Sequence, residues 1–298
     1  MLSLIAHRGP DGQGQWVDAH AGCYLGHRRL SILDLSTAGC QPMKSWDGRY
    51  ILSYNGEVYN FEALRTQLVK KGIPFKSTTD TEVVVNAIAQ MGLKEALTHF
   101  NGMFALACWD VHDRILYLAR DRVGIKPLYY WESAHGFAFA SEAKAFLALR
   151  GYTPTISPQG LQNYFNYGHS IGEDCMLKGV AKVPPGSYLA IRLNGASIRK
   201  RFLSYYDYST NEALTSTSRQ KVTASKLRSV MCGAVKRQLK ADVPVGVFLS
   251  GGVDSAILTA LASHELSPSS TQAFTLVYPK AGMDYNELDA SSRMAKHF

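Results

Sequence analysis

The stretch DVPVGVFLSGGVDSA, residues 242–256, decides how the second half of this chain folds. Its apolar part, Val243–Leu249, has the length and composition of a buried parallel strand. A pair of glycines follows, and the spacing beyond them predicts a helix over about Ser255–His264. A second apolar run, Phe274–Tyr278, completes one strand–helix–strand unit, which is the element from which parallel α/β sheets are built.

A strand, a glycine turn and a helix form the context in which phosphate is commonly bound. Gly251 and Gly252 lack side chains, so backbone N–H groups can approach phosphate oxygens at the positive end of the helix dipole. Ser250 and Ser255 offer hydroxyl donors on either side of the turn. The Asp254 carboxylate repels phosphate unless a divalent cation lies between them, which predicts Mg²⁺. No lysine follows the glycines, so the loop is not a Walker loop and suits release of pyrophosphate. A glycine-rich turn without a ligand is the alternative.

The composition is that of an ordinary globular protein. The 298 residues are 46% hydrophobic and 19% charged, enough for two domains with separate cores. No apolar run reaches eighteen residues, which predicts no membrane span. The apolar opening Met1–Ala6 is too short for a signal peptide. Five cysteines without a CxxC pair favour a reducing cytoplasm and argue against structural zinc.

The excess of basic residues leaves the choice of partner open. A net charge of +8 fits either a nucleic acid or a small anion. Arg199, Lys200 and Arg201 are consecutive, but no basic motif interleaved with aromatic residues follows them, so we expect no nucleic-acid partner.

The first two hundred residues predict an antiparallel sheet with helices packed on it. Arg49–Tyr54 is a β-type run. Three further pairs of runs, each joined by a polar turn, predict hairpins: Met103–Trp109 with Ile115–Ala119, Leu128–Trp131 with Phe137–Ala140, and Tyr188–Leu193 with Ser197–Phe202. The turn Asn194-Gly195 between the last two is the strongest short hairpin signal in the chain.

Two amphipathic helices are predicted between the first strand and the hairpins. Phe61, Leu64 and Leu68 repeat at helical spacing, with Asn60 as the N-cap and Gly72 as the stop. The second helix carries its apolar face on Val84, Ala87, Ile88 and Met91, with Gly92 just beyond it.

The composition changes after Tyr208. Ser209–Ser218 is rich in Ser and Thr and indicates a linker or a long surface loop. An amphipathic helix follows, with Leu227, Val230, Met231 and Ala234 on one side, and the chain ends in a helix over Asn286–His297. We therefore predict one domain over residues 1–208 and another over 219–298. One strand–helix–strand unit cannot cover both faces of a parallel sheet, so the second domain is expected to be incomplete.

Several segments ahead of the glycine loop indicate ligand recognition. His7–Gly12 and His27–Ser31 place arginines beside turns, and Asn55-Gly56-Glu57 ends a strand. Asp80 lies at the start of a helix, where Thr79 and Glu82 form a predicted capping box that leaves Asp80 for another partner.

Taken together, these motifs resemble the glutamine-dependent asparagine synthetase family. The matching segments run in family order: HRGPDG at 7–12, HRRLSILDLS at 27–36, YNGEVYN at 54–60, RDRVGIKPLYY at 120–130, ASEAKAF at 140–146, VPPGSYL at 183–189 and DVPVGVFLSGGVDSA at 242–256. They cover nearly the whole chain, and a single motif alone would be far less specific.

The resemblance implies two domains with different chemistry. The first is a class II glutamine amidotransferase domain of the Ntn-hydrolase type, an αββα sandwich. The second begins a Rossmann-like ATP-pyrophosphatase domain. In such enzymes glutamine is hydrolysed in the first domain, and the ammonia passes through an internal tunnel. It then attacks the aspartate side-chain carboxyl, which ATP has converted to an acyl-adenylate.

The resemblance also implies roles for individual residues. Arg29 would hold the glutamine α-carboxylate, and Asp80 would pair with the α-amino group. Asn55 and Gly56 would form the oxyanion hole. The remaining glutamine-pocket residues would be Leu30, Ser31, Ile32, Leu33 and Glu57. In the second domain Leu249 and Leu276 would pack against adenine, Ser250, Gly251, Gly252 and Ser255 would bind the phosphates of ATP, and Asp254 would hold Mg²⁺.

The sequence departs from the family pattern at both ends. Family members begin with a processed Met-Cys whose α-amino group activates the thiolate, and roughly the first forty residues of that pattern are absent here. Cys23 and Cys40 are not N-terminal and do not replace it. The later segments that complete the adenylate and aspartate sites lie beyond Phe298. We therefore expect a fragment, truncated at both ends, that does not release ammonia from glutamine and is impaired in synthesis.

Three alternatives remain open on the sequence. The same architecture amidates other carboxylates, or sugars in surface-polysaccharide synthesis. A non-catalytic remnant would bind glutamine or nucleotide without turnover. The chain would also function as a homodimer or with a complementing chain that supplies the missing parts. A tRNA-modifying ATP-pyrophosphatase shares the glycine loop, but the first two hundred residues argue against it.

Overall fold

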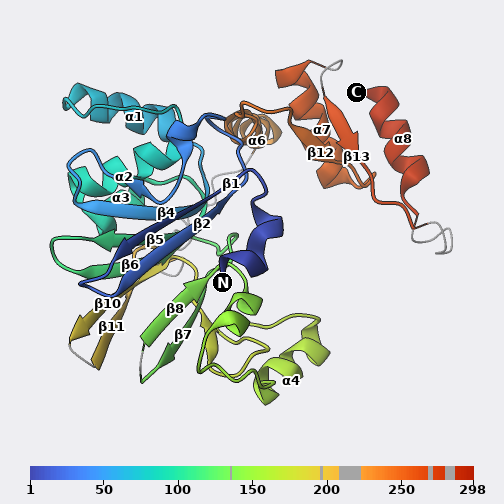
Figure 1. Cartoon of the computed structure of the whole chain (residues 1–298). Coiled ribbons are helices and arrows are strands. Elements are labelled where there is room, and N and C mark those ends of the chain that lie inside the picture. Colours follow the sequence, from blue (N-terminus) through green and yellow to red (C-terminus); the bar gives the residue numbers. More distant parts are fainter. Residues whose placement is uncertain (135, 195–196, 208–222, 268–270, 279–285) are drawn as a thin grey trace. The chain divides into compact units, whose positions relative to one another are not determined.

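The computed structural model describes residues 1–134, 136–194, 197–207, 223–267, 271–278 and 286–298 (Figure 1). The chain forms two compact units, Met1–Ser216 and Thr217–Phe298. Each unit is described by itself below. In the described residues, no helix combines the length and the apolar character that crossing a membrane requires.

The first unit is built on a six-stranded antiparallel sheet with the order β11-β10-β6-β5-β4-β3 (Figure 1). Its strands are β3 (Met43–Lys44), β4 (Tyr50–Val58), β5 (Gly102–Asp110), β6 (Ile115–Arg120), β10 (Ser187–Asn194) and β11 (Ser197–Ser204). Strand β5 is apolar at almost every position because both faces of the sheet are covered. Side chains of β5 alternate between two cores: Phe104, Leu106 and Cys108 enter one, and Ala105, Ala107 and Trp109 the other.

Three helices cover one face of this sheet: α1 (Phe61–Lys70), α2 (Asp80–Met91) and α3 (Leu93–His99) (Figure 1). Helix α2 is buried along most of its length, and Val83, Val84 and Ile88 are fully inaccessible. It packs on Tyr54 and Leu106 of the central strands. This buried helix therefore carries its own N-terminus, where Asp80 lies, against the sheet.

A second β layer covers the other face of the large sheet. It consists of two separate antiparallel sheets, β1-β2 and β8-β7-β9. The strands are β1 (Gly12–Asp18), β2 (Cys23–Arg29), β7 (Tyr129–Ser133), β8 (Gly136–Ala140) and β9 (Val180–Lys182). Leu25, Leu128 and Tyr130 of this layer share a core with Trp109 and Leu118 of the large sheet.

The second β layer is covered in turn by irregular helical segments. In β7 and β8, Tyr130 and Phe139 point inward, whereas Trp131 and Ala140 belong to a third core with Phe146. Phe146 lies on η3 (Ala143–Ala148), and the remaining short helices are η1 (Leu2–Arg8), η2 (Thr37–Gly39) and α4 (Pro158–Tyr167). The layer order is thus helix, sheet, sheet, helix, and the mixed α/β fold class predicted from the sequence is confirmed.

The second unit contains the predicted strand–helix–strand element. Strands β12 (Gly246–Phe248) and β13 (Gln272–Phe274) pair in parallel, and the helices are α6 (Ala224–Gln238), α7 (Val253–Leu266) and α8 (Leu288–His297). The prediction that both strands are buried is wrong. Phe248 is 86% exposed and Phe274 53%, and the two rings contact each other. No described element of this unit covers them.

Helix α6 also differs from its prediction, because its apolar side is not buried. Leu227 and Val230 are more than half exposed, and no residue of α6 is buried. The helix itself is present, with the Thr223 hydroxyl accepting a hydrogen bond from the Lys226 amide as its N-cap.

Two predictions about helix starts are corrected by hydrogen bonds. Thr79 is the N-cap of α2, but Glu82 does not complete a capping box. Its carboxylate instead accepts hydrogen bonds from the Lys76 and Ser77 amides, at 2.7–3.1 Å, because the preceding loop folds back over the helix start. Asn60 occupies the N-cap of α1 without capping it, since its side chain bridges the His99 carbonyl and the Asn101 amide.

The three predicted hairpins are present as antiparallel pairs β5–β6, β7–β8 and β10–β11. Two predictions fall outside the described residues: the linker over Ser209–Ser218 and the glycine of the Asn194-Gly195 turn.

Candidate functional site

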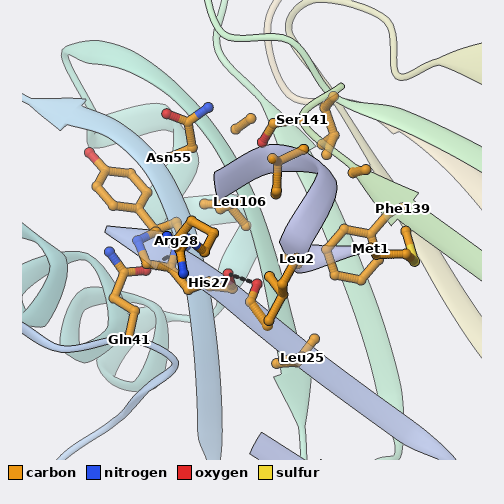
Figure 2. Close-up of a pocket in the computed structure, with 18 of the residues that line it drawn as sticks. Met1, Leu2, Leu25, His27, Arg28, Gln41, Asn55, Leu106, Phe139 and Ser141 are labelled. Atoms are coloured by element: carbon orange, nitrogen blue, oxygen red, sulfur yellow. Dashed lines mark hydrogen bonds between the residues drawn. The ribbon is translucent and has the colours of Figure 1, made fainter. Parts of the chain in front are cut away.

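A cavity of about 1200 Å³ lies in the first unit, between the large sheet and the second β layer (Figure 2). Strands β2, β4, β5 and β8 and the start of α2 supply its wall. Of the nine predicted glutamine-pocket residues, eight line it: Arg29, Leu30, Ile32, Leu33, Asn55, Gly56, Glu57 and Asp80. Ser31 is not part of the wall, and its backbone amide donates to Asp11 Oδ2 at 2.8 Å.

Arg29 ends strand β2 and is 9% exposed. Its guanidinium donates to backbone carbonyls of the loop that follows: to Ser36 at 2.7 Å, to Leu33 at 3.3 Å and to Asp34. A guanidinium has five N–H groups, so these three bonds leave donors for a carboxylate. Gly39 packs directly on the guanidinium, where a Cβ would collide with it. The loop thus fixes the direction of the Arg29 side chain.

Asp80 is the first residue of α2 and is 4% exposed. Its Oδ2 accepts hydrogen bonds from the Tyr54 hydroxyl at 2.8 Å and from the Val58 amide at 2.9 Å. Burial raises the pKa of Asp80 even though these hydrogen bonds oppose the shift. A buried carboxylate with a raised pKa gains free energy when a cationic group enters the cavity beside it.

Glu57 is a second carboxylate on the cavity wall. Its pKa is raised, first by burial and then by repulsion from Asp80. Lys126, another wall residue, opposes that shift, and burial lowers the pKa of Lys126 in turn. The cavity therefore holds two carboxylates in a region that disfavours their charge, close enough to repel one another.

The loop that presents Lys126 is held by its neighbours Arg120 and Asp121. The Asp121 carboxylate is fully buried and accepts hydrogen bonds from the amides of Phe104, Ile125 and Lys126 at 2.9–3.1 Å. The Arg120 guanidinium donates to the carbonyls of Gly124 at 2.7 Å and Lys126 at 2.8 Å. These hydrogen bonds explain why the segment RDRVGIK forms a defined loop that holds Lys126 in place.

Asn55 and Gly56 lie on β4, opposite Ala105 and Phe104 of β5. The Asn55 Nδ2 atom is buried and has no hydrogen-bond partner in the structure. Such a donor costs free energy unless an acceptor reaches it. Gly56 is required by close packing, because a Cβ there would lie 2.6 Å from Phe104 Cα and closer still to Met103 O.

Two further titratable groups face the cavity from β2. Burial raises the pKa of the Cys23 thiol to about 12, with a smaller contribution from Asp18. Burial and the charge of Arg29 lower the pKa of His27 to about 4. Both groups are therefore neutral near pH 7, and Cys23 is a thiol rather than a thiolate.

In the second unit, the predicted phosphate loop is a tight turn before α7. Gly251 has a φ of 81°, which favours glycine, and Gly252 is the helix N-cap. The Ser250 and Ser255 hydroxyls hydrogen-bond each other at 3.0 Å, and the Ser250 amide donates to Ser255 Oγ at 3.2 Å. Asp254 lies in the first turn of α7 and is exposed. Gly252, Val253 and Asp254 are exposed, whereas Gly251 packs against Ala290 and Ser291 of α8.

The two residues predicted to pack against adenine lie in different environments. Leu249 is 1% exposed, whereas Leu276 is 67% exposed. The backbone between them is tied together, with the Leu249 amide donating to Phe274 O at 2.9 Å and Thr275 Oγ1 donating to Leu249 O at 2.8 Å. Of the two, only Leu276 offers side-chain surface to a ligand.

No group of three or more His, Cys, Asp and Glu side chains in the described residues can hold a metal ion alone. Mg²⁺ is commonly bound through one or two carboxylates together with the phosphates of a substrate. Asp254 is an accessible oxygen donor of the right kind, so the residues fit.

Sequence reasoning missed three residues of the first site: Lys126, Tyr54 and Gln41. Gln41 Oε1 accepts from the Tyr54 amide at 2.7 Å, and its Nε2 donates to Thr81 Oγ1 at 3.4 Å. All three lie in or beside motifs that were used for the family resemblance, but their roles depend on contacts across the sheet. A lysine between two turn formers, Gly124 and Pro127, was the one signal available.

The class of the first unit follows from a match to a glutamine amidotransferase domain. The family model for that domain matches residues 1–205, and the chain belongs to this family. Residues 226–298 match the model for asparagine synthase. The predicted pair of domain types is thereby confirmed.

Curated relatives match this chain over nearly its whole length. The chain is 35% identical over 295 residues to asparagine synthetase [glutamine-hydrolyzing] 1 of Bacillus subtilis, covering 99% of this chain and 44% of the relative. It is 36% identical to the amidase chry2 of Gibberella zeae, over 93% of this chain and 42% of that protein. The chain thus spans about half the length of the curated relatives it matches.

Among solved structures, the chain is similar to the glutamine phosphoribosylpyrophosphate amidotransferase of B. subtilis. That match has 18% identity and a TM-score of 0.44, and it covers 88% of this chain and 53% of that one.

Proposed function

We propose that this chain acts in glutamine-dependent asparagine synthesis, as a carbon–nitrogen ligase with glutamine as amido donor. Its first unit binds glutamine in the cavity, and its second unit binds ATP at Ser250–Ser255. The sequence similarity to asparagine synthetases supports this assignment. It rests mainly on the arrangement of charged groups in the cavity.

The cavity wall complements a free α-amino acid. Arg29 offers guanidinium donors to an α-carboxylate. Asp80 and Glu57 have raised pKa values, and the repulsion between them is relieved by an α-ammonium group. An uncharged ligand would add no cation to offset the repulsion between these two carboxylates. The observation on which the proposal depends is that the buried guanidinium of Arg29 and the carboxylates of Asp80 and Glu57, whose pKa values are raised, line the same cavity.

The side-chain amide of the ligand has a matching donor. Asn55 Nδ2 is buried without a partner, and the carbonyl oxygen of a bound amide would satisfy it. Donors that meet a developing oxyanion lower the barrier to amide cleavage by several kcal/mol in other enzymes, about 3 kcal/mol for one donor. Asn55 and the backbone amide of Gly56 take this role in the proposal.

Amide cleavage also needs a nucleophile, and none of the five cysteines, all within the described part of the chain, fits that task. Cys23 lines the cavity, but burial keeps its thiol protonated at neutral pH. The other four do not belong to the cavity wall: Cys40 is exposed, Cys108 and Cys175 are buried, and Cys232 is half-buried. We therefore propose that this chain supplies the glutamine-binding residues and that the nucleophile is not one of these five cysteines.

ATP supplies the leaving group that makes a carboxylate reactive toward ammonia. The backbone amides at the start of α7 and the hydroxyls of Ser250 and Ser255 would bind its phosphates. Asp254 would hold Mg²⁺ between its carboxylate and those phosphates, which neutralises their repulsion. Leu276 offers an exposed apolar side chain to the base.

The proposal is tested by titrating L-glutamine into the 298-residue chain in a calorimeter. We expect saturable binding at pH 7.5 that weakens about 100-fold in Asp80→Asn, because a charge-assisted hydrogen bond in a buried site is lost. Glu95→Gln removes an exposed carboxylate on α3 and should leave the affinity unchanged. Absence of glutamine binding by the wild-type chain, or equal binding by Asp80→Asn, would refute the assignment of the cavity.

A further inference from the structure

Asp34 lies outside the predicted glutamine pocket but occupies a special position beside it. It is 8% exposed and has a φ of 56°, a conformation that costs free energy for any residue other than glycine. Its carboxylate serves two segments of the chain. Oδ1 accepts from the Ser36 amide at 3.1 Å and the Ser36 hydroxyl at 2.5 Å, and Oδ2 accepts from the Thr78 amide at 2.8 Å.

The first of these segments holds Arg29. The carbonyls of Leu33, Asp34 and Ser36 all accept hydrogen bonds from its guanidinium. The conformation of residues 33–36 therefore decides where that guanidinium points. The two bonds from Ser36 to Asp34 Oδ1 close this loop on itself.

The second segment leads to Asp80. Thr78 and Thr79 directly precede α2, and the Thr79 hydroxyl accepts from the Thr81 amide as the helix N-cap. On the other side, the Glu82 carboxylate accepts from the Ser77 amide at 2.7 Å and the Ser77 hydroxyl at 2.6 Å. The turn before Asp80 is thus fixed by Glu82 within its own segment and by Asp34 from across the chain.

We propose that Asp34 is a positioning residue that sets the distance between the two groups that recognise the amino-acid end of glutamine. One carboxylate joins the loop that orients Arg29 to the turn that presents Asp80. The inference rests on the proposed function, because it assigns Arg29 to the α-carboxylate and Asp80 to the α-ammonium of the same ligand. The hydrogen bonds from Ser36 and Thr78 also lower the pKa of Asp34, which keeps it an acceptor at neutral pH.

This arrangement gives the buried aspartate with a left-handed backbone a role at this place. A ligand with both charged groups gains from each only if their separation matches its own. A residue that merely stabilised the loop would affect every ligand of the cavity to the same degree. A residue that sets the separation affects the ligand with two charged groups most.

The variant Asp34→Asn tests this directly. Asparagine keeps one oxygen for Ser36 but turns an NH₂ group toward the Thr78 amide, so the hydrogen bond from that amide to residue 34 is lost. Asp47→Asn is the matched control. Asp47 accepts from the Ser45 hydroxyl at 2.6 Å and the Arg49 amide at 3.1 Å in a similar local turn, away from the cavity.

Three ligands are compared by calorimetry and, for weak binders, by competition: L-glutamine, 4-aminobutanamide, which lacks the carboxylate, and glutaric acid monoamide, which lacks the amino group. We expect Asp34→Asn to weaken L-glutamine about tenfold and each analogue about twofold or less. Asp47→Asn should change none of the three. Thermal unfolding of each variant is measured to show that it is folded.

Hydrogen exchange gives a second readout. In Asp34→Asn the amides of residues 76–82 should exchange faster than in the wild type. In Asp47→Asn the exchange of the same amides should not change. If the wild-type chain binds glutamine and Asp34→Asn loses all three ligands equally, or loses none, the positioning role is wrong while the proposed function stands. If the wild-type chain does not bind glutamine, both the positioning role of Asp34 and the proposed function are refuted.

Discussion

The substitution Gly56→Ala should damage the centre of the large sheet. A Cβ at position 56 would lie 2.6 Å from Phe104 Cα, closer still to Met103 O, and 2.8 Å from Phe104 Cβ. Real Cβ atoms essentially never come within 3.0 Å of such neighbours. The obstacles belong to the backbone of β5 and the first side-chain atom, so no flexible side chain can move aside.

The strands β4 and β5 must therefore separate by roughly one ångström around Gly56, because the Cβ would lie 2.1 Å from Met103 O, at a cost of about 3 kcal/mol, the upper end for overpacking. β5 is held on its other side by β6, whereas β4 pairs with β3 only at Ile51 and Leu52, so the movement falls on β4 around Gly56. Separation lengthens the hydrogen bonds of the ladder and loosens the contact between Tyr54 and Leu106 in the core.

Urea unfolding followed by circular dichroism measures this cost. Gly136→Ala is the control, because a Cβ at that position in β8 meets nothing within 4 Å and needs no unusual φ. We expect the midpoint of Gly136→Ala to stay the same or to rise slightly. A loss below about 0.5 kcal/mol for Gly56→Ala would show that β4 and β5 yield easily, which contradicts the reasoning from close packing.

Three further results are expected. Arg49→Ala should lower the free energy of unfolding by about 2 kcal/mol at pH 7, because it leaves the 1%-exposed Asp110 carboxylate without its partner. Arg65→Ala, a substitution on α1, is the control, and an equal loss of stability in the two variants would contradict this. His27→Gln should reduce the loss of stability on acidification. The pKa of His27 is about 4 when folded and 6.5 when unfolded, so wild-type stability falls as pH drops from 6.5 to 4, by up to about 3 kcal/mol. Urea midpoints at pH 7 and pH 4.5 measure how much stability each protein loses on acidification. An equal loss in the wild type and in His27→Gln would refute this expectation. Asp254→Asn should weaken Mg²⁺-dependent ATP binding about tenfold while leaving glutamine binding unchanged; calorimetry with and without EDTA decides, and an unchanged ATP affinity would remove Asp254 from the metal site.

Much of the fold was predictable because its signals are local. The alternating cores of β5 and its hairpin with β6 follow from an apolar run, a polar turn and a second run. The strands β1 and β2 were missed because Gly12–Asp18 mixes glycine with polar residues and alternates only weakly. The exposed strands of the second unit were mispredicted because an apolar run indicates burial only if another element covers it, and sequence does not show that for Phe248.

The candidate site was predictable only through the family motifs. Asp80 was singled out for a partly wrong reason, since Glu82 binds the 76–77 backbone rather than completing a capping box. Lys126 and Asp34 were not found, because each acts on a residue far away in the sequence: Lys126 on Glu57, and Asp34 on Thr78. Such pairs have no periodic signal along a single chain.

The loop from Asp121 to Lys126 has a consequence for redesign of this protein. Its shape is set by bonds from Arg120 and Asp121 to backbone atoms, not by the side chains between them. Val123 and Ile125 are 54% and 59% exposed. Polar residues or a reporter group can therefore replace these two side chains, making the surface more soluble or labelling it, while the lysine on the cavity wall keeps its place.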